Sequence, residues 1–325
     1  MGSGATLDWP CLGWTCLGTM MAAASANSLN QILEVKNDGL MKRTMRRPLP
    51  SGRLSVEHAL AWAVCSGIGG VGLLAFQTNS LVAGLGAANI LLYTLAYTPL
   101  KQIHPVNTWI GAVVGAIPPL MGWAAAAGQL DLGGWVLAAV LYFWQIPHFM
   151  ALASLCSSDY AAGGYKMLSG KRAALIALRN CVYLLPVGFV AQHLGITSGF
   201  FGPEALVLTA GMGITAAMFY FSPTAKRARQ LFRASLLYLP LFMGAMLLHR
   251  LPNIEQHKEH SALADCDAVM TEDVLLRDSE ERPDRTLPKF DDRNFLESPS
   301  RPPIAFVSIA PFPFLPAPEY RTSFP

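Results

Sequence analysis

The chain has 325 residues, of which 52% are hydrophobic and only 14% are charged. Soluble proteins carry about 25% charged residues, so this composition excludes an ordinary soluble domain and indicates a polytopic membrane protein. The net charge of +3 is unevenly divided: residues 1–251 hold 16 basic and 7 acidic side chains, whereas residues 252–325 hold 8 and 14. We therefore expect an all-α transmembrane bundle over 1–251, an acidic, proline-rich, disordered tail over 252–325, and no nucleic-acid partner.

Eight apolar segments approach the roughly 20 residues that a membrane-spanning helix needs. They cover residues 10–33, 56–76, 80–98, 106–127, 133–156, 173–194, 203–221 and 234–251. The loops after the first, third, fifth and seventh segments carry most of the lysines and arginines, as loops on the cytoplasmic or matrix side of a membrane do. We call this side of the predicted bundle the basic face, and we place both chain ends of the apolar region on the opposite side.

The first apolar segment ends in three polar residues spaced four apart: Asn30, Glu34 and Asp38. Helical spacing of four keeps side chains on nearly one side of a helix. Two carboxylates and an amide oxygen suit Mg²⁺, which also keeps waters and substrate phosphates as ligands. The alternative is a set of polar side chains that reach from a helix end to the membrane interface.

A dense basic run follows at once and favours the metal site over that alternative. Arginine side chains bind phosphate oxygens through two parallel hydrogen bonds. Arg43 and Arg47 are one helical turn apart, so we expect them to face the same site. Lys42 and Arg46 are interpreted as contacts to lipid headgroups. The run therefore predicts a polyphosphate next to the metal.

The stretch from Tyr97 to Pro119 joins two predicted spans on the basic face. Lys101 lies in that loop, where an ammonium group can reach a phosphate, and Asn107 begins the next span close by. Gly111 and Gly115 are four residues apart, a spacing that permits close packing of two helices.

The stretch from 142 to 167 holds a histidine inside an apolar span and an aspartate after it. An ionisable residue within a membrane helix often has a function, and His148 is open to three roles: iron ligand, proton acceptor or hydrogen-bonded helix partner. Asp159 lies on the basic face and can join the first Mg²⁺ or hold a second. Tyr160 and Tyr165 are weaker candidates for substrate contact.

Three motifs, in order over residues 8–251, resemble those of the UbiA-like intramembrane prenyltransferases, and within them the mitochondrial protoheme IX farnesyltransferases, or heme O synthases. The motifs are NQILEVKNDGLMKRTMRRPLPSG, YTPLKQIHPVNTWIGAVVGAIPPLMGW and YFWQIPHFMALASLCSSDYAAGGYKM. The resemblance implies transfer of a farnesyl group from farnesyl diphosphate to a vinyl group of heme b. Water then completes a hydroxyalkyl group, and the heme O formed serves cytochrome c oxidase.

The resemblance also implies roles for the residues singled out above. Mg²⁺ would be held by Asn30, Glu34, Asp38 and Asp159. The departing diphosphate would be stabilised by Arg43, Arg47 and Lys101. Catalysis would rest on Glu34, Asp38, Lys101 and Asp159, with Asn107, Tyr160 and His148 as further substrate contacts, His148 to the heme.

The implied setting is the mitochondrial inner membrane, with the lipid bilayer and heme A synthase as partners. Members of this family carry a transit peptide and a further membrane helix before the segment that corresponds to residue 8, so we expect that the first family helix is missing here. Two alternatives stay open: a prenyltransferase with a quinone or chlorin acceptor, and a truncated, catalytically silent membrane protein. A transporter would show inverted repeats, and none is visible in the sequence.

Overall fold

The computed structural model describes residue 2 and residues 7–251. Over these residues the fold is helical, with one isolated β-bridge between Thr197 and Arg250 and no strand. The predicted tail over 252–325 lies outside the described residues. The predicted all-α membrane bundle is confirmed for the part of the chain that the structure covers.

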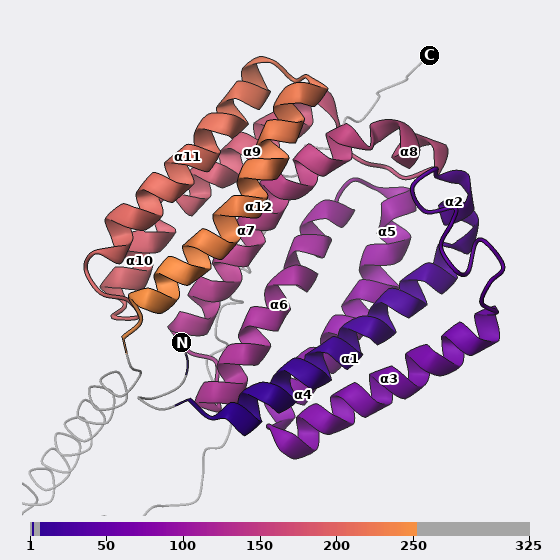
Figure 1. The fold of residues 1–325 in the computed structure, drawn as a ribbon, viewed down its shortest axis with the longest axis horizontal. Helices are drawn as coiled ribbons and strands as arrows, with labels where there is room; N and C mark the ends of the chain where they lie inside the picture. Colours follow the sequence, from indigo (N-terminus) through magenta and orange to yellow (C-terminus); the bar gives the residue numbers. More distant parts are fainter. Residues whose placement is uncertain (1, 3–6, 252–325) are drawn as a thin grey trace, which may run out of the picture. The chain divides into compact units, whose positions relative to one another are not determined.

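The helices follow one another along the chain and are drawn in Figure 1. They are α1 (Trp9–Leu33), α2 (Val35–Leu40), α3 (Val56–Gln77), α4 (Ser80–Leu91), the π-helical segment η1 (Leu92–Tyr97), α5 (Thr98–Ile103), α6 (Asn107–Ala127), α7 (Leu132–Leu155), α8 (Ser157–Ala162), α9 (Gly170–Leu184), α10 (Val187–His193), α11 (Phe201–Phe221) and α12 (Ala225–Leu248).

Seven of the eight predicted spans are helices that are long and apolar enough to cross a membrane. Two of them, Ser80–Ile103 and Gly170–His193, are built from consecutive helical segments. The last span begins at Ala225, well before the predicted residue 234. The basic residues that were predicted in a loop therefore lie on the first turns of α12, where the Thr224 hydroxyl accepts a 3.4 Å bond from the Arg227 amide and caps the helix.

The first predicted span is a helix, α1, but it is not among the seven. Its buried side carries polar residues such as Thr15, Ser25 and Asn30. It lies alongside α3 in the opposite direction (Figure 1). The two helices approach closely: the Ser25 hydroxyl donates a 2.7 Å bond to the Ala63 carbonyl. A Cβ added at Gly70 would lie only 2.9 Å from the carbonyl oxygen of Gly18, so small residues set this contact.

The extended apolar core is formed by α6, α7 and the helices after them, and α6 packs directly on α7. Segments from three predicted loops meet at one end of the bundle. There α2 packs against α8 (Figure 1), and the Lys166 amide donates a 2.7 Å bond to the Lys101 carbonyl. This end is the predicted basic face, and it holds the candidate site.

Candidate active site

The three polar residues of the first motif lie at a break between two helices. α1 ends at Leu33, Glu34 has φ −105° and ψ 11°, and α2 begins at Val35. The Glu34 amide still bonds to the Asn30 carbonyl at 3.0 Å, and the Asp38 amide to the Glu34 carbonyl at 2.8 Å. The spacing of one turn is therefore kept across the break, and Asn30, Glu34 and Asp38 are all buried, as residues on one inward side must be.

Lys101 brings a cation to the centre of this motif. Its Nζ lies 2.9 Å from Oε1 and 3.0 Å from Oε2 of Glu34. The side chains are 11% and 4% exposed, so both charges are shielded from water. The ammonium also lies 4.7 Å from the ring centre of Tyr97 and 5.8 Å from that of Tyr165. Taking two such charges out of water costs free energy, which only close contacts between them offset. We interpret this pair as a candidate binding site for an ionic ligand.

Asp38 has its own cation. Arg47 Nη1 lies 2.7 Å from Asp38 Oδ2, with the aspartate side chain 2% and the arginine side chain 36% exposed. The chain reaches this geometry through turns: the Thr44 hydroxyl donates a 2.9 Å bond to the Asp38 carbonyl, and the Arg47 amide donates to the Thr44 carbonyl. Each carboxylate of the motif is thus paired with one cation from a later segment.

The prediction that Arg43 and Arg47 lie one turn apart on a single helix is wrong, because residues 41–50 form turns. That both arginines face the same site stays a prediction. The helix ends at Leu40 because Met41 turns to an extended conformation and its side chain is buried next to Gly163. In the turns that follow, the Arg43 guanidinium lies 5.9 Å from the ring centre of Tyr160, whereas Arg47 bonds to Asp38. Lys42 and Arg46 are exposed, as expected for headgroup contacts.

The segment after α7 carries two of the predicted residues, Asp159 and Tyr160, and it is bonded to α2 and to the start of α6. Asn37 Nδ2 donates a 2.7 Å bond to the Gly163 carbonyl, which ties α2 to this segment. Asn107 is fully buried and donates to the carbonyls of His104 and Lys166 at 2.8 and 3.2 Å. These bonds hold the two loops together, while Oδ1 of Asn107 has no hydrogen-bond partner among the described residues. The predicted substrate contact of Asn107 stays a prediction.

Asp159 is placed nearby but stands apart from the two buried carboxylates. It lies half-buried in the first turn of α8, the helix that packs against α2. Within the described residues its carboxylate makes no ion pair or hydrogen bond, and no cluster of three His, Cys, Asp or Glu residues is arranged to hold a metal. Its part in metal binding stays a prediction.

Two tyrosines of this segment are neutral groups beside the charges. Burial raises the pKa of the Tyr160 phenol. Burial also raises the pKa of Tyr165, and the negative charges of Glu34 and Asp38 raise it further. Both phenols therefore keep their protons and can donate a hydrogen bond to an anionic ligand.

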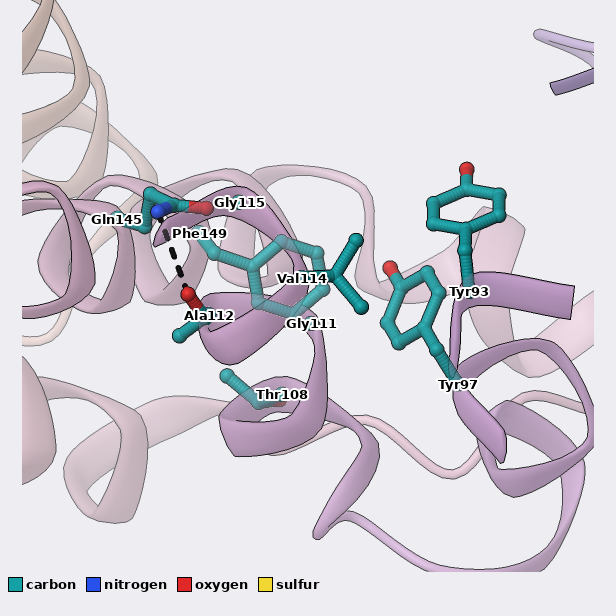
Figure 2. A pocket seen from close by; sticks show the side chains of 9 residues that line it. All are labelled: Tyr93, Tyr97, Thr108, Gly111, Ala112, Val114, Gly115, Gln145 and Phe149. Carbon is teal, nitrogen blue, oxygen red and sulfur yellow. Dashed lines mark hydrogen bonds between the residues drawn. The ribbon is translucent and has the colours of Figure 1, made fainter. Parts of the chain in front are cut away.

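A cavity of about 220 Å³ lies between η1, α6 and α7 (Figure 2). Its lining consists of Tyr93, Tyr97, Thr108, Gly111, Ala112, Val114, Gly115, Gln145 and Phe149. Tyr97 belongs to both features, because its ring lines the cavity and lies against the Lys101 ammonium. The Tyr97 ring therefore separates the Glu34–Lys101 ion pair from a mainly apolar, aromatic cavity.

The sequence reasoning missed the aromatic wall of this chamber. At the end of the π-helical stretch the Tyr93 carbonyl accepts a bond from the Thr98 amide and a 2.9 Å bond from the Thr98 hydroxyl. Such stretches often mark functional sites. The hydroxyl of Tyr93 lies 3.5 Å from Oδ1 of Asn30. The sequence feature that could have indicated this aromatic wall is the pair of tyrosines, Tyr93 and Tyr97, four residues apart just before Lys101.

Gly111 and Gly115 do more than permit helix packing, the role that the sequence predicts for them. A Cβ at Gly111 would lie 2.7 Å from the Tyr97 ring, and one at Gly115 would lie against Oε1 of Gln145. Both glycines therefore leave the room that two cavity-lining side chains occupy. Gln145, an amide in the middle of an apolar span, was itself a signal for this position.

His148 does not line the cavity. Its Nδ1 lies 2.9 Å from the hydroxyl of Ser235 on α12, and its ring stacks between Trp144 and Phe232 at centroid distances of 5.1 and 4.8 Å. Gln145, on the neighbouring side of the same helix, faces the cavity instead. Of the three roles that the sequence leaves open for His148, the structure displays the hydrogen-bonded helix partner.

Comparisons with known proteins show the family of the chain. The UbiA prenyltransferase family matches residues 1–243. A mitochondrial protoheme IX farnesyltransferase of Arabidopsis thaliana is 53% identical over 98% of this chain and 72% of that protein. The human protein of the same name is 45% identical over 76% of this chain and 56% of its own length. A protoheme IX farnesyltransferase of Koribacter versatilis is 37% identical over 74% of this chain and 83% of its own length. The chain thus spans little more than half of the human relative.

Two solved structures share the fold. One, from a study of digeranylgeranylglyceryl phosphate synthase in membranes, matches with a TM-score of 0.65 and 16% identity over 76% of this chain and 88% of its own. The other, the apo form of a UbiA homolog from Aeropyrum pernix K1, matches with a TM-score of 0.58 and 19% identity over 75% and 90%. At these identities the likeness supports the helical arrangement alone.

Proposed function

This chain belongs to the UbiA prenyltransferase family, and we propose that it transfers the farnesyl group of farnesyl diphosphate to a vinyl group of heme b, giving heme O. The observation that carries the proposal is that two buried carboxylates each bind a cation, and that one of these cations, Lys101, lies against the Tyr97 ring that lines an apolar cavity. Relatives named protoheme IX farnesyltransferase support the choice of donor and acceptor. The protein works as a multi-pass protein of the mitochondrial inner membrane.

The donor atoms of the first motif fit Mg²⁺ by their chemistry, since two carboxylates and an amide oxygen are hard oxygen ligands. Glu34, Asp38 and Asn30 would hold the ion, which would supply positive charge to the diphosphate; Asp159 is proposed as a further ligand. Lys101 and Arg47 now neutralise the two carboxylates. When a diphosphate binds, these cations are free to pair with its oxygens, so the site exchanges one set of ion pairs for another.

The same cations assist the departure of diphosphate. Negative charge grows on its bridging oxygen as the bond to the farnesyl carbon breaks, and fixed positive groups stabilise that charge. Before diphosphate binds, Glu34 holds the Lys101 ammonium against the ring of Tyr97, close to where it would be needed. The electron-rich face of this ring also suits the positive charge that develops on the farnesyl carbon. The cavity beyond Tyr97 takes the apolar chain and keeps bulk water away.

The remaining predicted residues complete the site from its outer side. Arg43 and Tyr160 lie together over α8, where we propose that they contact the substrate. Asn107 acts by holding the loop that carries Lys166 against the loop after α5. His148 remains the proposed heme contact from the α7–α12 interface. Heme A synthase is the proposed consumer of the product.

The test is a transfer assay with the purified chain in detergent. Farnesyl diphosphate, heme b and Mg²⁺ should give a heme product heavier by one farnesyl group and one hydroxyl group, and omission of Mg²⁺ should abolish it. Quinone and chlorin acceptors are assayed beside heme b. Faster transfer to a quinone or chlorin would support the alternative acceptor class, and transfer to none of them would leave a catalytically silent membrane protein.

Gly111→Ala is expected to slow the transfer reaction about 10- to 100-fold, because small displacements of positioning groups have effects of that size. The added methyl group would lie 2.7 Å from the Tyr97 ring and would push the ring into the cavity or away from Lys101. Gly122→Ala, on the same helix, is the matched control, because its Cβ would meet nothing within 4 Å. Steady-state rates at varied farnesyl diphosphate concentration measure the difference, and equal rates for the two variants would contradict it.

A further inference from the structure

Asn37 belongs to the first motif, but the proposed roles above do not use it. It precedes Asp38 on α2, and its side chain bonds to two other segments at once. Its Nδ2 donates a 2.7 Å bond to the Gly163 carbonyl at the end of α8, and its Oδ1 accepts a 3.2 Å bond from Nε2 of Gln102 on α5. Asparagine is a poorer helix former than alanine or leucine, so Asn37 adds little to α2 itself and acts through these contacts.

These bonds complete a closed ring that joins three segments far apart in the sequence. Shortly after Gly163, the Lys166 amide donates a 2.7 Å bond to the Lys101 carbonyl. Gln102 follows Lys101 directly and bonds back to Asn37. Among the described residues, Asn37 makes every hydrogen bond from α2 to residues 98–103 and 157–167. Its removal would leave Lys166 bonded to Lys101 but would leave α2 without a hydrogen bond to either segment.

The position of Asp159 depends on this ring. The Gly163 amide donates a 2.9 Å bond to the Asp159 carbonyl, so Asn37 holds the end of α8 one turn away from Asp159. Glu34 and Asp38 are each held by a cation, whereas the Asp159 carboxylate makes no ion pair or hydrogen bond among the described residues. Its distance from the two buried carboxylates is therefore set by how α8 lies on α2 (Figure 1).

A second contact between these segments is apolar. Met41, which follows α2, is buried against Gly163, where an added Cβ would lie 3.0 Å from its Cγ. Apolar contacts bring two surfaces together without fixing a direction, whereas a hydrogen bond requires a short distance and a nearly straight angle. The bond from Asn37 to Gly163 is therefore the contact that orients α8 relative to α2.

We propose that Asn37 is a positioning residue that holds Asp159 where it can share one Mg²⁺ with Glu34 and Asp38. The inference rests on the proposed function, and it explains how ligands from two distant segments of the chain reach one ion. Asn37 acts through Asp159 and need not touch the ion or the diphosphate. Groups that orient metal ligands without binding the metal change metal affinity by about 10- to 100-fold when they are removed.

Calorimetric titration of the purified chain with Mg²⁺, in the presence of inorganic diphosphate, tests this through a double-mutant cycle. Asn37→Ala should bind Mg²⁺ about 10-fold more weakly than the unaltered chain, and Asp159→Asn should bind it at least as weakly. The double variant Asn37→Ala/Asp159→Asn should bind no more weakly than Asp159→Asn alone, because a positioning residue has no further effect once its ligand is gone. Gly39→Ala should bind like the unaltered chain. It is the matched control, because Gly39 lies on the same helix and its Cβ would meet nothing within 4 Å.

Hydrogen–deuterium exchange of the metal-free chain separates positioning from a general loss of stability. In Asn37→Ala the amides of residues 157–167 should exchange faster, while those of α9, α11 and α12 keep their original rates. Gly39→Ala should change neither set. If the alanine variant does not fold, Asn37→Leu, which has nearly the same size and no hydrogen-bonding group, carries the same measurements.

Three results would overturn the inference while the proposed function stands. The first is unchanged Mg²⁺ affinity or unchanged exchange of residues 157–167 in Asn37→Ala. The second is an equal loss of affinity from Asn37→Ala with and without Asp159→Asn, since Asn37 would then not act through Asp159. The third is normal Mg²⁺ affinity in Asp159→Asn, since Asp159 would then not be a ligand. By contrast, no farnesylated heme and no Mg²⁺-dependent diphosphate binding in the unaltered chain would refute the proposed function itself, and this inference with it.

Discussion

Glu34→Gln should lower the rate of farnesyl transfer by about 100- to 1000-fold, the range found when one preorganised electrostatic contact at a reacting centre is removed. Glu34 has two proposed tasks: it holds the Lys101 ammonium at 2.9 Å and provides a metal ligand. The amide keeps the size of the side chain but has no negative charge for either task. Turnover of the purified variant with farnesyl diphosphate and heme b measures the effect.

The same substitution removes the charge partner of a buried ammonium group, so it also acts on stability. Breaking a buried ion pair from one side costs about 3–5 kcal/mol, and a loss of activity alone would not separate the two effects. The double variant Glu34→Gln/Lys101→Met removes both charges and should regain most of the lost melting temperature. It should stay inactive, because neither the metal ligand nor the phosphate cation returns. Recovery of turnover together with stability would show that the pair is structural only.

Asp38→Asn should reduce turnover by a similar factor, about 100- to 1000-fold, because Asp38 is the second proposed carboxylate of the metal site. Its side chain is 2% exposed and has the Arg47 guanidinium at 2.7 Å. The variant should remain inserted in the membrane, since Arg47 is more than a third exposed and water can solvate it once it is unpaired. Membrane fractionation and the transfer assay together check this result.

Two substitutions of Arg47, the arginine that pairs with Asp38, should reduce turnover by different amounts. Arg47→Lys keeps the charge but loses the flat, two-pronged geometry, so we expect about a tenfold loss, whereas Arg47→Gln should lose more. Arg46→Gln is the matched control, because Arg46 is the exposed neighbour that was assigned to the membrane surface. Near-normal turnover in Asp38→Asn, or an effect of Arg46→Gln as large as that of Arg47→Gln, would remove the metal-site assignment.

The sequence predicted the membrane spans and the first motif well, because both depend on local patterns. Apolar length identifies a span without knowledge of its neighbours. The spacing of Asn30, Glu34 and Asp38 depends on backbone geometry that survives even the helix break at Glu34. The charges of the loops placed Lys101 on the correct side of the bundle, and the structure adds that it contacts Glu34 directly.

Features that depend on packing between distant segments could not be predicted. The sequence cannot show that Met41 turns the chain out of a helix by burying its side chain, so that Arg43 and Arg47 lie on turns and not on one helix. It gives no direction for His148, which faces Ser235 although its neighbour Gln145 faces the cavity. Apolar α12 also begins earlier than predicted, because long basic side chains on a first turn can reach the membrane surface.

The central claim is that the two buried carboxylate–cation pairs form a metal-dependent diphosphate site. Calorimetric titration of the purified chain with inorganic diphosphate, with and without Mg²⁺, tests it most directly. Binding should require Mg²⁺ and should disappear in the folded double variant Glu34→Gln/Lys101→Met, while Gly122→Ala binds like the unaltered chain. Diphosphate binding that needs no Mg²⁺ and persists in the double variant would contradict the claim.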